Sequence, residues 1–393
     1  MEKTRAEAWG TRMNRILFLE ALPTISGGQR VLIDLMPALV QQFDATVLVP
    51  AEGPLADALR AAGARVTVLP MADYTLVDKR GRDVFTFIVD TPRLALALAR
   101  LVRQEDARLV YVNNSRAFIW GTLGARLSGR PAIWHAHNIF GDSKTRALVS
   151  WFARMKTVRH IICPSDAAAA QFARQRDKVV VVPSGVDLAG FAPSLDARAA
   201  KRTELGIASN ARVVGIIGDL IPLKGQDIFI QAAMQVARQS PETTFLIVGN
   251  ARPTDESQHY QAALQSAIRH SPSAIRLLGF QPDIVALLNA LDVLVVASRT
   301  ETGPLVLLQA LACGVPVVST PVGMAPRLLR DGACGRLFSI DDAAALAEAL
   351  ADLIHRPDAL AAMRGAARQR AVAELDLKRT QARIAALIAE AVR

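Results

Sequence analysis

Short apolar runs rich in β-branched residues alternate with amphipathic stretches along most of the chain. Continuous apolar strands joined by helices are typical of a parallel sheet covered on both faces. The first half therefore predicts one doubly wound α/β domain. Its strands are expected at residues 16–20, 45–50, 66–69, 109–112, 132–137, 161–164 and 179–182, and its helices at residues 29–43, 54–62, 92–104 and 145–159.

The alternation resumes after a link that contains Pro183, Gly185 and Pro193, which predicts a second α/β domain. Its strands are expected to begin at Val213 and to include residues 245–249, 275–278, 293–296 and 315–319, with a helix at 226–239 and Ala-rich helix over 341–393. The domains are placed at 1–190, 191–372 and 373–393; residues 1–12 are expected to be disordered, and the last segment is a helix that can cross back to the N-terminal domain. Ligands of such domains bind at the carboxyl ends of the strands.

The composition limits the class of protein. A chain of 393 residues, 51% hydrophobic and 21% charged, is long enough for two buried cores. Cys163, Cys313 and Cys334 lie in apolar sequence at no metal-ligand spacing, so we expect reduced core cysteines in a cytosolic protein. The sequence shows no secretory signal and no apolar run long enough to span a bilayer.

A net charge of +10 and a pI near 10.1 indicate a polyanionic partner. Nucleic acid is disfavoured because the chain has no zinc-finger, helix-turn-helix or RNP-like pattern and only 5% aromatic residues. A phosphorylated substrate and an anionic membrane surface remain. Residues 143–160 combine five cations with apolar positions, so this helix either lies on anionic lipid or packs on its own sheet.

The segment 298–318 reads as strand, tight loop, short apolar helix and strand. Pro304 suits the first helical position, and Gly314 suits the left-handed residue that ends a helix. A helix that begins at the carboxyl end of a strand presents backbone N–H groups to an anion such as a diphosphate, and Glu301 lies at the mouth of this loop. A plain βαβ crossover without a ligand is the alternative.

Two further segments have phosphate-compatible patterns. Gly27 and Gly28 follow the first strand, although a plain βα turn explains the pair equally well and the G-x-G-x-x-G spacing is absent. Lys224 and Gly225 precede a helix, so the lysine ammonium adds a full positive charge to the partial positive charge of the helix N-terminus.

Two histidines follow one another at alternate positions near the end of the strand at 132–137. His135 and His137 are expected on the same face of it. A metal site is disfavoured because no cluster of further ligands accompanies them, which leaves substrate contact or a structural, hydrogen-bonded role.

The segment E-T-G-P-L-V-L-L-Q-A-L-A-C-G-V-P-V-V resembles the E-x7-E segment of retaining GT-B glycosyltransferases of family 4. That segment is usually E-x-F-G-x-x-x-x-E-A-x-A-x-G-x-P-V, so Gln309 replaces the second glutamate and Gly303-Pro304 replaces Phe-Gly. The segment G-D-L-I-P-L-K-G resembles the family's G-R-L-x-x-x-K-G motif, with Asp219 in place of arginine. The glycine pair is similar to the family's N-terminal glycine loop.

The resemblance implies a GT-B fold and a role for each matched residue. His137, Glu301 and Lys224 would be catalytic: His137 and Glu301 would contact the transferred sugar, and Lys224 would stabilise the diphosphate. Gln309 would contact the ribose. The remaining substrate-binding positions implied are Gly27, Gly28, Arg30, Asp219, Gly279, Phe280, Gln281, Thr302, Gly303, Pro304, Leu305 and Val306. Residues 279–281 would border the nucleobase, with Phe280 as a core residue the alternative.

Asp219 is the departure with the largest electrostatic consequence. A carboxylate about 4 Å from a phosphate repels it by roughly 4 kcal/mol at an effective dielectric constant of about 20. We therefore expect Asp219 either to point away or to be offset by a nearby arginine, with Arg30 and Arg299 as the candidates.

The function implied is retaining hexosyl transfer from a UDP- or GDP-linked sugar to a glycan or lipid-linked acceptor in cell-surface polysaccharide or glycolipid biosynthesis. No metal and no cofactor are implied. The expected location is the cytoplasm, with the inner face of the membrane as a peripheral site. A non-catalytic GT-B protein that binds a nucleotide sugar or a partner is the main alternative. A non-hydrolysing sugar-phosphate epimerase or a glycogen-phosphorylase-like enzyme of the same architecture is a third.

Overall fold

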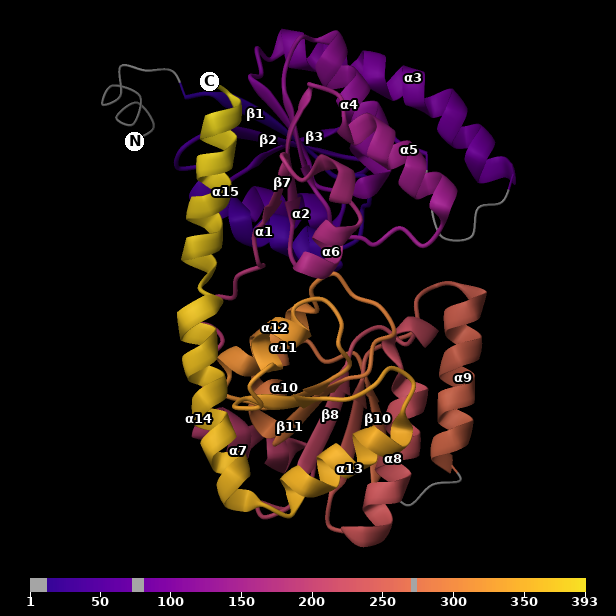
Figure 1. The fold of residues 1–393 in the computed structure, drawn as a ribbon, viewed down its shortest axis with the longest axis vertical. Helices are drawn as coiled ribbons and strands as arrows, with labels where there is room; N and C mark the ends of the chain where they lie inside the picture. Colours follow the sequence, from indigo (N-terminus) through magenta and orange to yellow (C-terminus); the bar gives the residue numbers. More distant parts are fainter. Residues whose placement is uncertain (1–12, 73–80, 270–273) are drawn as a thin grey trace. The chain divides into compact units, whose positions relative to one another are not determined.

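The structure is a computed structural model and describes residues 13–72, 81–269 and 274–393 (Figure 1). It divides into two compact units: unit 1 comprises Met1–Val182 with Thr380–Arg393, and unit 2 comprises Pro183–Arg379. The expectation of disorder at residues 1–12 lies outside the described residues. Each unit is built on one parallel sheet, as the sequence predicts.

Unit 1 contains a seven-stranded sheet in the order β3-β2-β1-β4-β5-β6-β7. All its pairings are parallel. From β1 the strands β2 and β3 are added toward one edge of the sheet, and the strands from β4 onward are added toward the other edge. The strands are β1 (Arg15–Leu19), β2 (Asp44–Val49), β3 (Arg65–Val68), β4 (Leu109–Val112), β5 (Ala132–His135), β6 (Val158–Cys163) and β7 (Val179–Val181).

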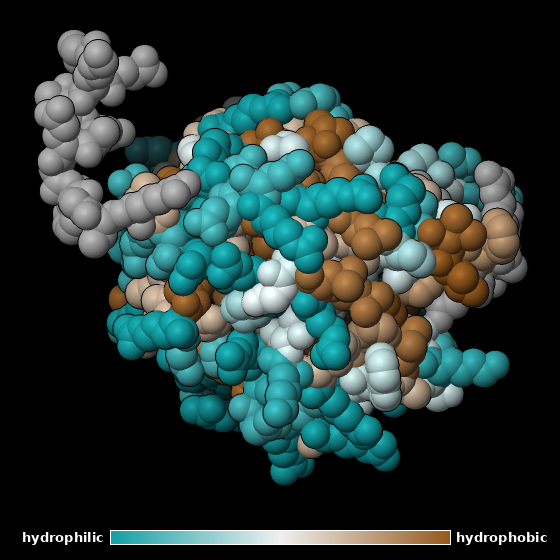
Figure 2. Space-filling view, turned by 90° about the horizontal axis from the view of Figure 1, so that it is seen from above, coloured by the Kyte–Doolittle hydropathy of each residue, from teal (hydrophilic) through white to brown (hydrophobic). Residues whose placement is uncertain are grey.

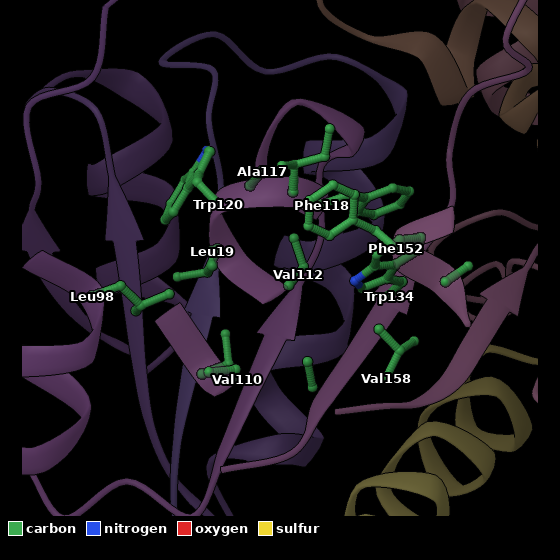
Figure 3. Close-up of a cluster of buried hydrophobic side chains, with 14 of the residues drawn as sticks. Leu19, Leu98, Val110, Val112, Ala117, Phe118, Trp120, Trp134, Phe152 and Val158 are labelled. Carbon is green, nitrogen blue, oxygen red and sulfur yellow. The ribbon is translucent and has the colours of Figure 1, made fainter. Parts of the chain in front are cut away.

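The helices of unit 1 cover its sheet. They are α1 (Gly27–Leu39), α2 (Pro54–Ala61), α3 (Gly81–Gln104), η1 (Ser115–Ala117), α4 (Phe118–Leu127), α5 (Ser143–Ala153), α6 (Asp166–Ala170) and η2 (Ala173–Gln175). Residues of α3, α4 and α5 share a core cluster with β1, β4 and β5 (Figure 3). At its centre Phe118 stacks on Trp134 with ring centroids 4.3 Å apart. The Trp134 indole N–H donates to Thr122 Oγ1 at 2.9 Å, so its polar atom is satisfied in the core.

Unit 2 contains a six-stranded parallel sheet in the order β10-β9-β8-β11-β12-β13. Its strands are β8 (Val213–Ile217), β9 (Thr244–Val248), β10 (Ile275–Gly279), β11 (Val293–Val296), β12 (Val317–Ser319) and β13 (Gly335–Leu337). Its helices are α7 (Leu195–Glu204), η3 (Pro222–Lys224), α8 (Gln226–Gln239), α9 (Asp255–Arg269), α10 (Ile284–Ala290), α11 (Leu305–Ala312), α12 (Ala325–Leu329), α13 (Ala343–Ile354) and α14 (Pro357–Glu374).

The Ala-rich C-terminal segment forms three helices, of which α15 (Leu377–Ala391) is the last. The chain bends between α14 and α15, where Val186 N donates to Leu375 O at 2.7 Å and Leu377 N donates to Val186 O at 3.1 Å. Beyond this bend, Gln381 Nε2 donates to Asp34 O in α1 at 2.7 Å. Residues 380–393 therefore pack within unit 1.

Several predicted bounds are wrong. Helix α3 begins at Gly81 and contains Pro92, because a proline on an exposed face interrupts one backbone hydrogen bond without clashing with the core. Strand β5 ends at His135, the basic helix ends at Ala153, and β13 was not expected. The predicted core cysteines, Cys163, Cys313 and Cys334, are buried free thiols. Among the described residues, no helix is long and apolar enough to cross a membrane.

Unit 2 depends on a buried carboxylate at the start of β11. Asp292 is 5% exposed and accepts from Arg198 Nη2 at 2.6 Å and Arg202 Nη2 at 2.8 Å. Its Oδ2 also accepts from Val213 N at 2.8 Å, at the first residue of β8. This cluster joins α7 to two central strands of the sheet, so it fixes the strands whose other ends carry the candidate site.

We predict that Asp292→Ala destabilises the protein by about 3–5 kcal/mol, because it leaves the Arg202 guanidinium buried without its counter-ion. Urea unfolding followed by circular dichroism measures this loss. Asp352→Ala is the matched control, because its pair with Arg356 is exposed and should contribute less than about 1 kcal/mol. Equal midpoints for the two variants would contradict the prediction.

Candidate functional site

In unit 2, polar side chains gather at the carboxyl ends of β8, β9 and β11. The loops after β8 and β9 touch through their backbones: a Cβ on Gly249 would lie only 1.9 Å from Gly218 O. Gly249 has a φ of +141°, which also favours glycine there. This close approach places residues 219 and 252, which follow the two strands, beside one another.

Lys224 and Glu301, two of the residues predicted to be catalytic, form an ion pair through Lys224 Nζ and Glu301 Oε1. Lys224 ends η3, and the left-handed Gly225 that follows it, with a φ of +71°, is the N-cap residue of α8. Ser298 Oγ donates to the same Glu301 oxygen at 3.3 Å. The side chains are 27% and 17% exposed, so an anion or a hydroxyl group that reaches either one competes with the other.

Helix α11 begins beside this pair. Pro304 is its N-cap residue and not its first helical residue as predicted, because its ψ of 105° is extended. Gly314 follows the helix with a φ of +68°, in the left-handed conformation that the sequence predicts. A cavity of about 10 Å³, room for about one water molecule, is lined by residues that include Lys224, Ser298, Glu301, Pro304 and Val306. The predicted residues Thr302, Gly303, Leu305, Val306 and Gln309 are all half-buried around this helix start.

Asp219 is offset by an arginine that the sequence analysis did not name. Arg252 donates to Asp219 Oδ2 from Nε at 2.8 Å, and its Nη2 lies 2.7 Å from the same oxygen. The candidate Arg299 is wrong, because it pairs with Asp227 at 2.8 Å and Asp341 at 2.7 Å. The candidate Arg30 lies on the exposed side of α1 in unit 1. Arg252 lies four positions after the end of β9, the strand that follows β8 along the chain. A basic residue at that place in the sequence is the signal that could have identified it.

The Asp219–Arg252 and Lys224–Glu301 pairs both lie close to Gly218. A Cβ on Gly218 would lie 3.5 Å from Lys224 Cε, so the lysine side chain passes over this glycine, and Asp219 follows it directly. Two cations and two carboxylates therefore meet at one edge of the sheet. Such an edge suits an anion with several charges, provided that it displaces a carboxylate from its cation.

The predicted residues 279–281 form the loop at the end of β10. Phe280 is 70% exposed, so the core alternative for it is wrong. Its backbone N donates to Asn250 Oδ1 at 3.0 Å, which ties this loop to the loop after β9. Gln281 accepts from Lys201 Nζ at 3.1 Å and donates to Leu278 O at 3.3 Å. The exposed Phe280 ring is the part of this loop that can stack on a planar ligand.

In unit 1, His137 lies just beyond β5 and close to the start of α1. Gly27 and Gly28 are the first two residues of α1, not a loop before it as predicted. A Cβ on Gly28 would lie 3.1 Å from two ring carbons of His137, so the glycine makes room for the imidazole. The His135 and His137 ring centroids are 3.9 Å apart, on one side as expected from the strand pattern.

A buried carboxylate fixes the orientation of His137 through an asparagine. Asn113 Nδ2 donates to Glu20 Oε2 at 2.9 Å and to Gly28 O at 3.2 Å. A backbone carbonyl only accepts, so Asn113 Oδ1 faces His137 Nε2, at 3.1 Å, and receives its proton. The neutral ring therefore carries its proton on Nε2 and has Nδ1 as an acceptor.

The charge states follow from burial. Burial lowers the pKa of His137 to about 4 and lowers the pKa of His135 well below its usual value, so both rings are neutral near pH 7. Tyr111 Oη lies 2.8 Å from His135 Nδ1. Burial also raises the pKa of Glu20, although hydrogen bonds from Asn113 and Asn114 act in the opposite direction. Among the described residues, no group of three or more His, Cys, Asp or Glu side chains could hold a metal ion.

Glu20 and Asn113 were not predicted as site residues. Both directly follow apolar strands, β1 and β4, which are neighbours in the sheet. A polar residue at the carboxyl end of a buried parallel strand is the signal that could have identified them.

Two family models match most of the chain. The model described as Glycosyltransferase Family 4 matches residues 25–189, and the model described as Glycosyl transferases group 1 matches residues 197–370.

Individual relatives align over most of their length. The chain is 29% identical over 346 residues to the Escherichia coli UDP-Gal:alpha-D-GlcNAc-diphosphoundecaprenol alpha-1,3-galactosyltransferase, and the match covers 84% of each protein. It is 28% identical over 326 residues to a Mycolicibacterium smegmatis GDP-mannose-dependent alpha-(1-6)-phosphatidylinositol monomannoside mannosyltransferase, covering 77% of this chain and 82% of the relative. The crystal structure of Anabaena HepE with UDP-glucose matches with a TM-score of 0.82 at 25% identity, covering 96% of this chain and all of the other.

We predict that His137 stays neutral down to about pH 5, because its pKa is lowered to about 4 by burial. Its contribution to stability is then present above the unfolded pKa of about 6.5 and is lost as the pH falls toward 4. NMR titration of the His137 ring resonances measures its pKa. The contribution to stability is measured by urea unfolding at several pH values, where His137→Gln should flatten the dependence of the urea midpoint on pH between 4 and 6.5. A His137 ring that titrates near 6.5 would contradict the buried, neutral assignment.

Proposed function

Because the chain belongs to the GT-B glycosyltransferases of family 4, whose models match residues 25–189 and 197–370, we propose that it transfers a hexosyl group with retention from a UDP- or GDP-linked sugar. The proposed acceptor is a glycan or lipid-linked sugar in cell-surface polysaccharide or glycolipid biosynthesis. The observation that carries this proposal is the Lys224–Glu301 pair at the start of α11. The printed substrates of the relatives, a UDP-linked and a GDP-linked sugar with lipid acceptors, support the choice of donor and acceptor.

Lys224 is proposed to stabilise the leaving group. As the bond between the sugar and the diphosphate breaks, negative charge grows on the diphosphate oxygens, and a fixed cation lowers the energy of that state. When Lys224 turns to the diphosphate, Glu301 is released to accept hydrogen bonds from sugar hydroxyl groups. Gln309, on α11, is proposed to contact the ribose, since an amide oxygen still accepts a hydroxyl proton.

Arg252 is proposed to supply the cation that the motif usually places at position 219. Asp219 would then hold the guanidinium at the diphosphate and would not itself face the phosphates. The pair is about half exposed, at 51% and 47%, so it contributes little to folding and its effect should appear in ligand binding.

His137 is proposed to contact the transferred sugar, with its ring held in place by Asn113 and, through Asn113, by Glu20. A neutral imidazole accepts a hydrogen bond from a sugar hydroxyl, whereas an imidazolium would not. The proposed location is the cytoplasm, with peripheral contact on the inner face of the membrane where a lipid-linked acceptor lies. The alternative is a protein that binds a nucleotide sugar without transfer, and labelled donor distinguishes the two by whether sugar moves to an acceptor or to water.

We expect a thermal-shift panel of UDP, GDP, ADP, CMP and their sugars to identify one stabilising nucleoside diphosphate. A ligand at 100 times its Kd adds about 2.7 kcal/mol. Lys224→Ala should weaken that ligand and lower kcat/KM by about two decades, because the growing charge of the leaving group loses its cation. Lys378→Ala, at an exposed lysine of α15, is the control and should change neither quantity.

Two outcomes would contradict this proposal. A Lys224→Ala variant that binds the nucleotide as tightly as wild type would place the diphosphate elsewhere. A wild-type protein that neither binds nor transfers any sugar of the panel would reject both the transferase and the binding-protein alternatives.

A charge-swap series tests the role of Arg252. Arg252→Ala should weaken the nucleoside diphosphate about tenfold or more, because it removes a cation and leaves Asp219 to repel the phosphates. Asp219→Arg alone should also weaken it, since two guanidinium groups would then face each other. The double variant Asp219→Arg/Arg252→Asp should bind within about threefold of wild type, because it restores an oppositely charged pair and places arginine at the motif position.

Isothermal titration calorimetry measures the three affinities, and Arg356→Ala, at an exposed arginine paired with Asp352, serves as control. If Arg252→Ala binds like wild type, Arg252 only neutralises Asp219 and has no part in donor binding. The Lys224 result is independent of this series.

A further inference from the structure

Helix α3 has apolar residues on two different faces. On the inner face, Leu94, Leu98 and Val102 are at most 1% exposed and belong to the core of unit 1. A second set follows the spacing i, i+3, i+4, i+7 and i+11, which places its members within an arc of about 100° on the helix surface. We call this set the outer stripe: Phe85, Ile88, Val89, Pro92 and Leu96.

The outer stripe is exposed. Phe85, Ile88, Val89 and Leu96 are 68%, 61%, 55% and 49% exposed, and Pro92 is exposed as well. Single exposed apolar residues need no explanation, but five on one helix face form a contiguous patch. In a helix whose other face already packs on a sheet, such a second stripe indicates contact with something outside the unit.

Helix α5 adds to the same side of unit 1. Its Val149 and Phe152 are buried at 3% and 8%, whereas Leu148 and Trp151 are 44% and 58% exposed. The packing alternative for this helix therefore holds for one face, which is buried against unit 1, and the other face is exposed. Helices α3 and α5 both contact α4, so the three form one layer over the sheet (Figure 1).

Positive charge accompanies these apolar residues. Figure 2 views the side of unit 1 that carries this layer, and hydrophobic side chains gather there between hydrophilic ones. Exposed cations follow on both helices: Arg100 on α3, and Lys144, Arg154 and Lys156 on and after α5. Arg93 on α3 is exposed as well but is paired with Asp90 at 3.0 Å. No acidic residue occurs between Ser143 and Ser165.

We propose that the outer stripe, together with Leu148 and Trp151, docks unit 1 on a lipid bilayer that contains anionic headgroups. A helix of this kind lies in the interface plane, with its apolar side immersed about 5–10 Å and its cations at the headgroups. A tryptophan at the edge of the patch suits the boundary between acyl chains and water. The biological reason for docking rests on the proposed function, because a lipid-linked acceptor lies at such a surface.

Flotation with vesicles tests the proposal without any sugar donor. Wild type should bind vesicles of 70% phosphatidylcholine and 30% phosphatidylglycerol and should bind pure phosphatidylcholine poorly. Ile88→Asn/Trp151→Gln should lower the partition coefficient at least about tenfold, because both side chains are exposed and would lose their immersion. Lys144→Gln/Arg154→Gln should lower it by about fivefold for each cation at low salt. Leu195→Asn is the matched control, an 84% exposed apolar residue of unit 2 whose loss should change nothing.

Three results would overturn the proposal. The first is vesicle binding that does not depend on lipid charge or salt concentration, and the second is unchanged vesicle binding by the Ile88→Asn/Trp151→Gln variant. The third is a dimer, detected by light scattering, that the same substitutions dissociate. The last result would assign this face to a second copy of the chain. Because the substituted residues are exposed, the variants should keep the wild-type melting temperature, and nucleotide binding in the panel should be unchanged. The membrane-docking proposal is therefore tested by vesicle binding alone and the proposed function by donor binding, so one can be rejected without the other.

Discussion

Neighbouring parallel strands must end at the same edge of a sheet, and within each unit the candidate site residues depend on this constraint. In unit 2 it brings the loops after β8 and β9 so close that Gly249 has no room for a side chain. Asp219 and Arg252, far apart in sequence, meet for that reason. In unit 1 the same constraint places Glu20, at the end of β1, beside Asn113, at the end of β4. The Asp292 cluster holds β8 and β11 at their opposite ends, so the edge is fixed by groups far from the chemistry.

The sequence predicts the parts of the site that a local pattern determines. Lys224 before α8, Gly314 after α11 and the continuous apolar strands are all local, and the structure has them where they were expected. Element ends were predicted less well. Pro304 fits an N-cap and a first helical position almost equally, because a fixed φ is compatible with both. His137 lies past the end of β5, and the residues of the strand itself do not show where its pairing stops.

What the sequence could not provide is the partner of each charged residue. Arg299 precedes Glu301 and was a reasonable candidate to offset Asp219, yet Asp227 and Asp341 hold it elsewhere. Which of two arginines reaches a carboxylate depends on strand order and on the direction in which each loop leaves the sheet. Those are tertiary properties. The pairing of Lys224 with Glu301 is of the same kind, since each was predicted as a ligand contact and their mutual contact was not.

The ion pairs also bear on the proposed diphosphate site, which contains two carboxylates. A net charge of +10 draws anions toward the protein, but at short range each cation near Gly218 is already satisfied. Exchange of a carboxylate for a phosphate at a cation costs little, because one charge-assisted contact replaces another. The released Glu301 carboxylate then gains hydrogen-bond donors only if a polyhydroxylated group is present. With a free nucleotide that lacks the sugar, Glu301 would keep only the hydrogen bond from Ser298 Oγ. Under the proposed function the pair would therefore bind the complete donor in preference to its product, through residues that the sequence patterns had assigned to separate roles.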